Sequence, residues 1–135
     1  MKLFRKNSRV WPVLAGLVLF SFIPALTAQT NADELLKKKY EKILGRYEFD
    51  YSSIGGETAI VEFRIGEGAL WIDDGDGRPA QLKPVNDSAV EFSGEDPNVG
   101  AIKVTFTVEE ASGVVKCRLL IPQIALDAPG IKLKQ

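Results

Sequence analysis

Apolar and polar residues alternate along most of the chain between residues 47 and 121. The first run places Tyr47 and Phe49 on one side and Glu48 and Asp50 on the other. This period of two is typical of half-buried antiparallel strands, with one face on a core and one face in water. Similar runs follow, so the sequence predicts seven strands, the other six at residues 59–65, 70–72, 80–83, 90–92, 102–108 and 115–121.

Short turn segments separate the predicted strands. They are rich in glycine, aspartate and asparagine, which suit tight turns, and they lie at residues 55–56, 66–68, 74–77, 86–87, 94–100 and 112–113. No connection between the strands is long enough for the crossover that a parallel pair requires. We therefore expect a mainly β fold, in which an antiparallel meander curls into a small lipocalin-like barrel or half-barrel. The tail, residues 122–135, is too apolar to be free, so we expect it to add an edge strand or to pack on the surface.

Ahead of the strands the apolar period changes to that of a helix. Apolar residues recur there every three or four positions and form one stripe: Leu36, Tyr40, Ile43 and Leu44. Asn31 and Glu34 have the spacing of a capping box, and Gly45 is a natural stop, so we expect one helix over residues 31–44. Glu34 and Lys38 are spaced for an ion pair on its solvated face. This helix would cover or plug one opening of the curled sheet.

The first 28 residues have a different character. Four basic residues and no acidic ones precede an uncharged apolar run at 13–23, and Pro24 and small residues up to Ala28 follow it. This layout is typical of a secretory signal peptide, so we expect cleavage after Ala28 and export to the periplasm or outside the cell. The remainder, residues 29–135, would be a single β-rich domain. The alternative is a retained anchor, although the run is shorter than the roughly 20 residues that span a bilayer.

Charge and composition exclude several classes of function. The chain has 17 Lys and Arg against 18 Asp and Glu, and removal of the four basic residues of the leader leaves about five excess negative charges. An acidic domain is a poor match for nucleic acid or for an anionic membrane surface. There is no histidine and one cysteine, Cys117, which excludes serine–histidine and cysteine–histidine catalysis and argues against tetrahedral zinc. We expect Cys117 to be a small buried hydrophobe.

Two sets of carboxylates are candidates for chemistry. Asp73, Asp74 and Asp76 could bind calcium, but the spacing of an EF-hand fails, and an Asp-Gly hairpin turn explains the segment without a metal. The residues available for an acid–base pair lie mostly on the solvated phase of their strands: Glu48, Asp50, Glu57, Glu62 and Glu91. We therefore expect no metal, no other cofactor, no catalytic residue and no enzymatic activity.

Aromatic residues are the candidates for the lining of an internal ligand cavity: Tyr47, Phe49, Phe63, Trp71 and Phe106. Trp71 is out of phase with Leu70 and Ile72, so it faces opposite to them. A barrel of about eight strands is just wide enough to hold one small ligand or to be filled by its own side chains, and the short strands here favour filling.

Several short motifs occur in an order known from one family: Gly45-Arg46-Tyr47, Gly68-Ala69-Leu70, Leu82-Lys83-Pro84-Val85, Phe92, Val104-Thr105-Phe106 and Gly113-Val114-Val115. Over residues 36–121 the chain resembles the small lipocalin-like β domain of unknown function that often follows serine β-lactamase-like hydrolase domains in bacteria. The resemblance implies a curled sheet or barrel and an accessory role, and it carries over no catalytic residue. We therefore expect an exported domain that binds a protein partner or a small apolar ligand. The alternatives are a structural protein–protein interaction module with a filled core and, third, a small carboxylate-dependent hydrolase.

Overall fold

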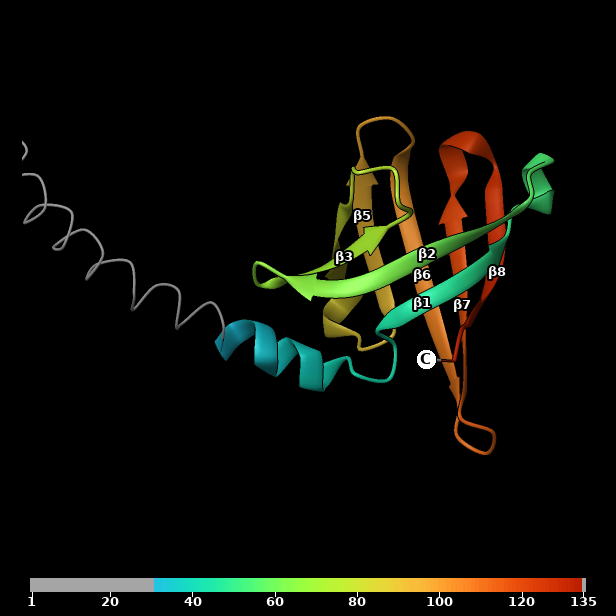
Figure 1. Ribbon diagram of the computed structural model, residues 1–135. Helices are drawn as coiled ribbons and strands as arrows, with labels where there is room; N and C mark the ends of the chain where they lie inside the picture. The colour runs from blue at the N-terminus through green and yellow to red at the C-terminus, as the bar shows by residue number, and fades with distance from the viewer. Residues whose placement is uncertain (1–30, 135) are drawn as a thin grey trace, which may run out of the picture.

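The protein forms a closed antiparallel β-barrel. The computed structural model describes residues 31–134, and the predicted signal peptide and its cleavage site lie outside these residues. Within them, eight strands pair in sequence order and the last pairs with the first (Figure 1): β1 (Gly45–Asp50), β2 (Thr58–Gly66), β3 (Ala69–Asp73), β4 (Ala80–Pro84), β5 (Glu91–Asp96), β6 (Gly100–Glu109), β7 (Val114–Ile121) and β8 (Leu126–Lys132). The predicted mainly β meander is confirmed, and it closes fully instead of stopping at a half-barrel.

The eighth strand comes from the tail, so the expectation that the tail adds a strand is confirmed, but this strand does not lie at an edge. β8 pairs with β7 at six positions and with β1 at three, so it closes the barrel between them. Gly130 lies opposite Phe49, and a Cβ atom on Gly130 would come within 2.6 Å of the Phe49 ring. Because β8 needs a glycine beside the Phe49 ring and has Pro129 before it, its sequence carries a weak strand signal.

Up-and-down connections place alternate turns at opposite ends of the barrel. One end, which we call the mouth, carries η1 (Ser52–Ile54), the β3–β4 turn, the β5–β6 turn and η3 (Pro122–Ile124). The other end, which we call the helix end, carries the β2–β3 turn, the segment with η2 (Val85–Asp87) and the β6–β7 turn. Figure 1 shows the helical segment that precedes β1 at this second end.

The helical segment is shorter than the sequence predicted. Residues 31–39 are helical and a turn follows through residue 43, whereas we expected a helix to residue 44. The turn brings Tyr40 and Ile43 under the barrel, where both are buried, and the Tyr47 hydroxyl donates a hydrogen bond of 2.8 Å to the Ile43 carbonyl oxygen. Glu34 pairs with Lys37 at 3.9 Å, not with Lys38 as its spacing had suggested. The helix therefore ends before the last residues of its apolar stripe, because those residues turn to pack against the barrel.

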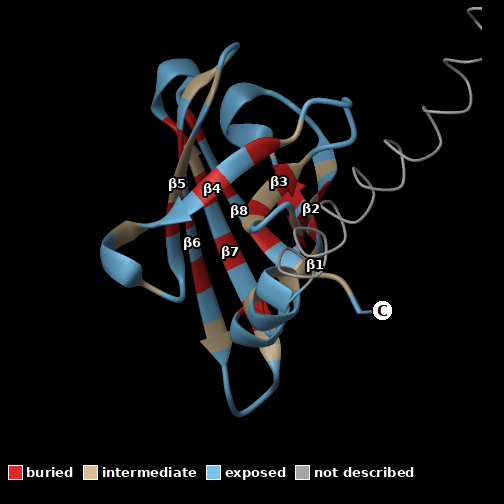
Figure 2. Cartoon of the chain, turned by 90° about the vertical axis from the view of Figure 1, so that its left-hand side faces the viewer, coloured by how far each residue is buried: buried red, intermediate tan, exposed pale blue. Residues whose placement is uncertain are grey.

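The core follows the predicted alternation of the strands. Figure 2 shows buried positions alternating with exposed ones, most plainly along β6 and β7. Within residues 31–134, the buried residues are all apolar or aromatic, and none is charged. Cys117 lies among them, as predicted, and burial raises the pKa of its thiol well above the usual range. This thiol is therefore held in its neutral, unreactive form.

Candidate functional site

Four of the five aromatic residues expected to line a cavity meet inside the barrel. The ring centroids of Phe63 and Phe106 lie 4.9 Å apart, and those of Tyr47 and Phe63 lie 5.2 Å apart, both pairs edge to face. Phe49 lies 6.3 Å from Phe63, and each of the four side chains is at most 2% exposed. Edge-to-face contact between rings is favourable, so this part of the interior is packed with aromatic side chains.

Trp71 lies apart from these four residues. It is half-exposed, whereas its neighbours Leu70 and Ile72 are buried, so it faces away from them as its phase predicted. Its Nε1 donates a hydrogen bond of 2.7 Å to the carbonyl oxygen of Gly66. None of the five aromatic residues lines either of the two hollows described below.

A cavity of about 200 Å³ opens at the mouth. Its floor consists of inward-facing apolar residues from six strands: Val61, Ile72, Ala80, Ile102, Leu119, Ile121 and Leu126. Sites for drug-sized ligands usually measure some 300–1,000 Å³, so this cavity suits one short alkyl chain or one ring.

The rim of the mouth has an apolar half and a charged half. Two neighbouring turns, η1 and η3, contribute Ile54 and Ile124, whose side chains are 45% and 39% exposed although both line the cavity. The β3–β4 and β5–β6 turns contribute the charged lining residues Asp74, Asp76, Arg78 and Asp96. The rim is therefore amphipathic, with apolar surface on one side and three carboxylates with one guanidinium on the other.

The acidic turns are built by hydrogen bonds to their own backbone. Oδ1 of Asp74 accepts from the N–H of Asp76 at 3.1 Å, and Oδ1 of Asp76 accepts from Arg78 at 2.7 Å. Oδ1 of Asp96 accepts in the same way from Asn98 at 2.7 Å. These local bonds favour tight turns, which is the interpretation given above to the Asp-Gly segment.

The three aspartates weighed as metal ligands do not converge. Asp73 lies beside Arg64, at 3.3 Å, and does not line the mouth, whereas Asp74 and Asp76 do. The Gly75 N–H and then the Arg64 guanidinium lower the pKa of Asp73. Within residues 31–134, no group of three or more His, Cys, Asp or Glu side chains is placed to hold a metal ion.

Asp74 and Tyr51 share a partly desolvated part of the mouth. Desolvation, followed by the neighbouring Asp76, raises the pKa of Asp74 above its usual value. Burial, followed by the charge of Asp74, raises the pKa of Tyr51. In the part of the chain that the structure describes, no ion pair involves Asp74, Asp76 or Asp96. The mouth therefore carries negative charge that no basic side chain pairs with.

The carboxylates considered for acid–base catalysis are dispersed. Glu48 and Glu91 are exposed, Glu62 pairs with Arg64 at 3.8 Å, and Asp50 accepts a hydrogen bond from the Ser52 N–H at 2.9 Å. Neither hollow is lined by these residues or by Glu57, the remaining candidate. The lack of enzymatic activity stays a prediction.

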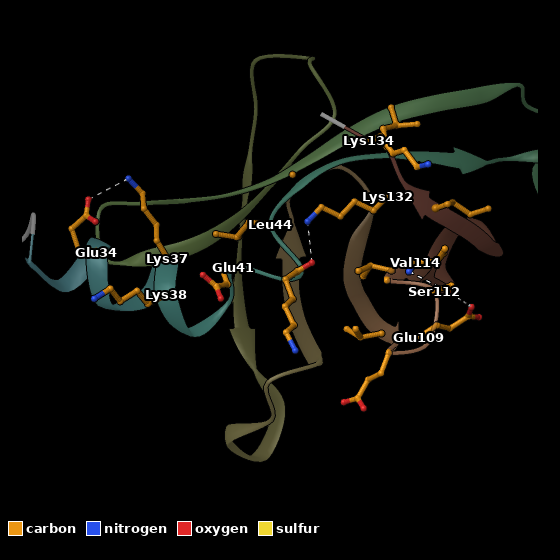
Figure 3. A pocket seen from close by; sticks show the side chains of 18 residues that line it. Glu34, Lys37, Lys38, Glu41, Leu44, Glu109, Ser112, Val114, Lys132 and Lys134 are labelled. Carbon is orange, nitrogen blue, oxygen red and sulfur yellow. Dashed lines mark hydrogen bonds and ion pairs between the residues drawn. The ribbon is translucent and has the colours of Figure 1, made fainter.

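A second hollow, a wide groove of about 1290 Å³, lies at the helix end between the helical segment, the β6–β7 turn and the end of β8 (Figure 3). Its lining carries lysine and glutamate in similar numbers, including Lys37, Lys38, Lys132 and Lys134 with Glu34, Glu41 and Glu109. The Lys132 ammonium donates a hydrogen bond of 3.0 Å to the Lys42 carbonyl oxygen, and desolvation lowers the pKa of Lys132. Because the charges are mixed, the groove favours no ligand of one sign.

Apart from Asp74 and Asp76, the residues of the mouth were missed from the sequence, although two signals for them exist. In an up-and-down meander every second turn lies at the same end, so the turns after β1, β3, β5 and β7 must meet. Ile54 and Ile124 are also large apolar residues inside turn segments, where polar residues are usual. Together these signals would have pointed to an apolar opening.

A comparison of the chain with protein-family models, with curated protein sequences and with solved structures finds no match in any of the three. Among residues 31–134, no helix has both the length and the apolar character needed to cross a membrane.

Proposed function

We propose that this protein is an exported, non-enzymatic accessory domain that binds a small ligand by holding its apolar end in the mouth of the barrel. The observation that carries this proposal is the apolar cavity of about 200 Å³ flanked by two exposed isoleucines. Single exposed apolar residues are ordinary on protein surfaces. Here, however, Ile54 and Ile124 come from two separate turns and border the same opening.

The filled interior limits the size of the ligand. The rings of Tyr47, Phe49, Phe63 and Phe106 pack against one another, and Tyr40 and Ile43 are buried at the helix end. A ligand therefore inserts a short chain or a single ring from the mouth, and the rest of it stays at the rim. Burial of its apolar surface, at about 25 cal/mol per Å², drives the binding.

The proposal is tested by titrating the isotope-labelled protein with a short alkyl ligand such as octanol and following its backbone amides by NMR. We expect shifts at the mouth, at Ile54, Val99 and Ile124, and none at Lys38 or Ser112 of the helix end. A serine at position 124 (Ile124→Ser) should weaken binding several-fold because apolar contact is lost. The matched control is Ile60→Ser, an isoleucine of β2 that is similarly exposed and does not line the cavity. Shifts confined to the helix end, or equal effects of the two variants, would exclude the mouth as the site.

The packed core also favours a second candidate, a protein–protein interaction module. Its surface would be the groove of about 1290 Å³ at the helix end, which is too wide for a small ligand to fill. Native mass spectrometry of the protein recovered from its exporting host separates the two candidates. A small added mass that leaves on denaturation supports ligand binding, and an added polypeptide supports the interaction module.

A further inference from the structure

We infer that the ligand of the mouth is a cationic amphiphile, with a short apolar chain that enters the cavity and an ammonium or guanidinium group that lies on the acidic half of the rim. This inference rests on the proposed function and names the chemical class of its ligand. It is carried by the placement of apolar and acidic residues around one cavity.

The two halves of the rim face the same opening. Ile54 and Ile124 border the cavity on the side of η1 and η3, which join β1 to β2 and β7 to β8. Asp74 and Asp76 of the β3–β4 turn and Asp96 of the β5–β6 turn border it on the other side. β4 pairs with β5, so the two acidic turns are neighbours, and a head group beside them is still adjacent to the chain in the cavity.

The protein itself leaves these carboxylates available. Each uses Oδ1 to accept a backbone N–H of its own turn, and no hydrogen bond in the described part of the chain uses Oδ2 of Asp74, Asp76 or Asp96. The rim holds one basic side chain, Arg78, against the three acids. A bound cation would therefore find acceptor oxygens that are free and a local charge of opposite sign.

Partial desolvation strengthens the preference for a cation. The raised pKa of Asp74 shows that its charged form is disfavoured by its surroundings, which include Tyr51, Asp76 and Asp96 as well as Arg78. The opposite charge of an ammonium group beside it would offset this penalty, whereas the like charge of a carboxylate head group would add to it. The mouth should therefore discriminate among amphiphiles by the sign of their charge.

Three ligands with one alkyl chain test the inference: octylamine, octanol and octanoate, each titrated calorimetrically at neutral pH and low salt. We expect the amine to bind about tenfold more tightly than the alcohol, and octanoate to bind most weakly. Equal affinities, or tighter binding of octanoate, would overturn the inference and leave the proposed function standing. If none of the three binds at the mouth, both fail.

A variant of the mouth and a control at the helix end locate the effect. Asp76→Asn and Asp96→Asn together remove two charges, while the amide oxygens can still accept the N–H groups of Arg78 and Asn98. We expect the affinity for octylamine to fall about tenfold and the affinity for octanol to stay unchanged. The control is Asp33→Asn at the helix end, where the carboxylate accepts the Gly68 N–H at 2.6 Å. An equal loss in this control would show a general charge effect and overturn the inference.

Discussion

The two ends of the barrel differ in how far their apolar side chains are buried. At the helix end, a turn after the helical segment buries Tyr40 and Ile43, which are 5% and 3% exposed. At the mouth, two 3-10 turns of three residues each leave Ile54 and Ile124 exposed above a cavity. Turns of this length are too short to fold back over the opening. The comparison teaches that the side chains of one end complete the core, whereas those of the other end are left exposed around a cavity.

The largest expected difference is in stability, when one large side chain is truncated in the packed centre of the barrel and one at the mouth. Phe106→Ala should lower the free energy of unfolding by about 3–5 kcal/mol, because it leaves a cavity among tightly packed rings. Ile124→Ala at the mouth should cost less than about 1 kcal/mol, since this side chain is already 39% exposed. Urea denaturation followed by circular dichroism measures both values. Similar losses for the two variants would show that the mouth is as well packed as the centre.

The opposite test enlarges one small side chain in the packed interior and one at the mouth. Ala128 is fully buried and borders neither hollow, so Ala128→Val should cost about 1–3 kcal/mol by overpacking. Ala80 lines the mouth cavity, so Ala80→Val should change stability by less than about 0.5 kcal/mol and weaken binding of an octyl chain. Thermal unfolding and calorimetric titration measure the two effects. A strongly destabilised Ala80→Val variant would mean that the cavity has no room for two further methyl groups.

Removal of the Tyr47 hydroxyl should destabilise the helix end by less than the substitutions in the core cost. Tyr47→Phe deletes the donor to the Ile43 carbonyl oxygen and should cost about 1 kcal/mol. Hydrogen exchange should become faster at the amides of Ile43 and Leu44, which close the turn over Tyr40. The control is Tyr51→Phe at the mouth, where we expect little change. Unchanged exchange in Tyr47→Phe would show that packing alone holds the turn.

The smallest expected effect is a dependence of ligand binding on pH. Because the pKa of Asp74 is raised, this carboxyl takes up a proton at a higher pH than an ordinary aspartate, whose pKa is about 3.9. Affinity for octylamine should therefore fall a few-fold as the pH is lowered towards this range, while the amine stays charged. Protonation should at the same time add a little stability, since the folded state disfavours the charged form of Asp74.

Calorimetric titration between neutral and mildly acidic pH, with Asp74→Asn as the comparison, tests this dependence. The variant should flatten the profile, whereas Asp33→Asn at the helix end should leave it intact. A profile that is the same with and without the Asp74 carboxyl would assign the pH dependence to another group.

Most of the fold was predictable from local patterns, and the site was not. The alternation of residues such as Tyr47 and Phe49 identified every strand up to β7, with ends that differ by a few residues. β8 was missed as a closing strand because Pro129 and Gly130 are poor strand formers, and a glycine is needed at 130 because the Phe49 ring lies opposite. The aromatic residues were correctly placed on inward faces except for Trp71, whose phase set it outside. Their packing fills the centre of the barrel, so the cavity at the mouth is lined by other apolar residues of the strands and by residues of the turns.

The sequence by itself determined most of the secondary structure, the buried face of β1 to β7 and the acidic character of the turns, because these depend on neighbours along the chain. Only the tertiary structure decided which rings meet, that the tail closes the barrel and which end stays open. Tyr47 and Phe106 come into contact through the register of several strands, and Ile54 and Asp96 border the same opening for the same reason. Such meetings depend on how all eight strands pair, which no local pattern encodes.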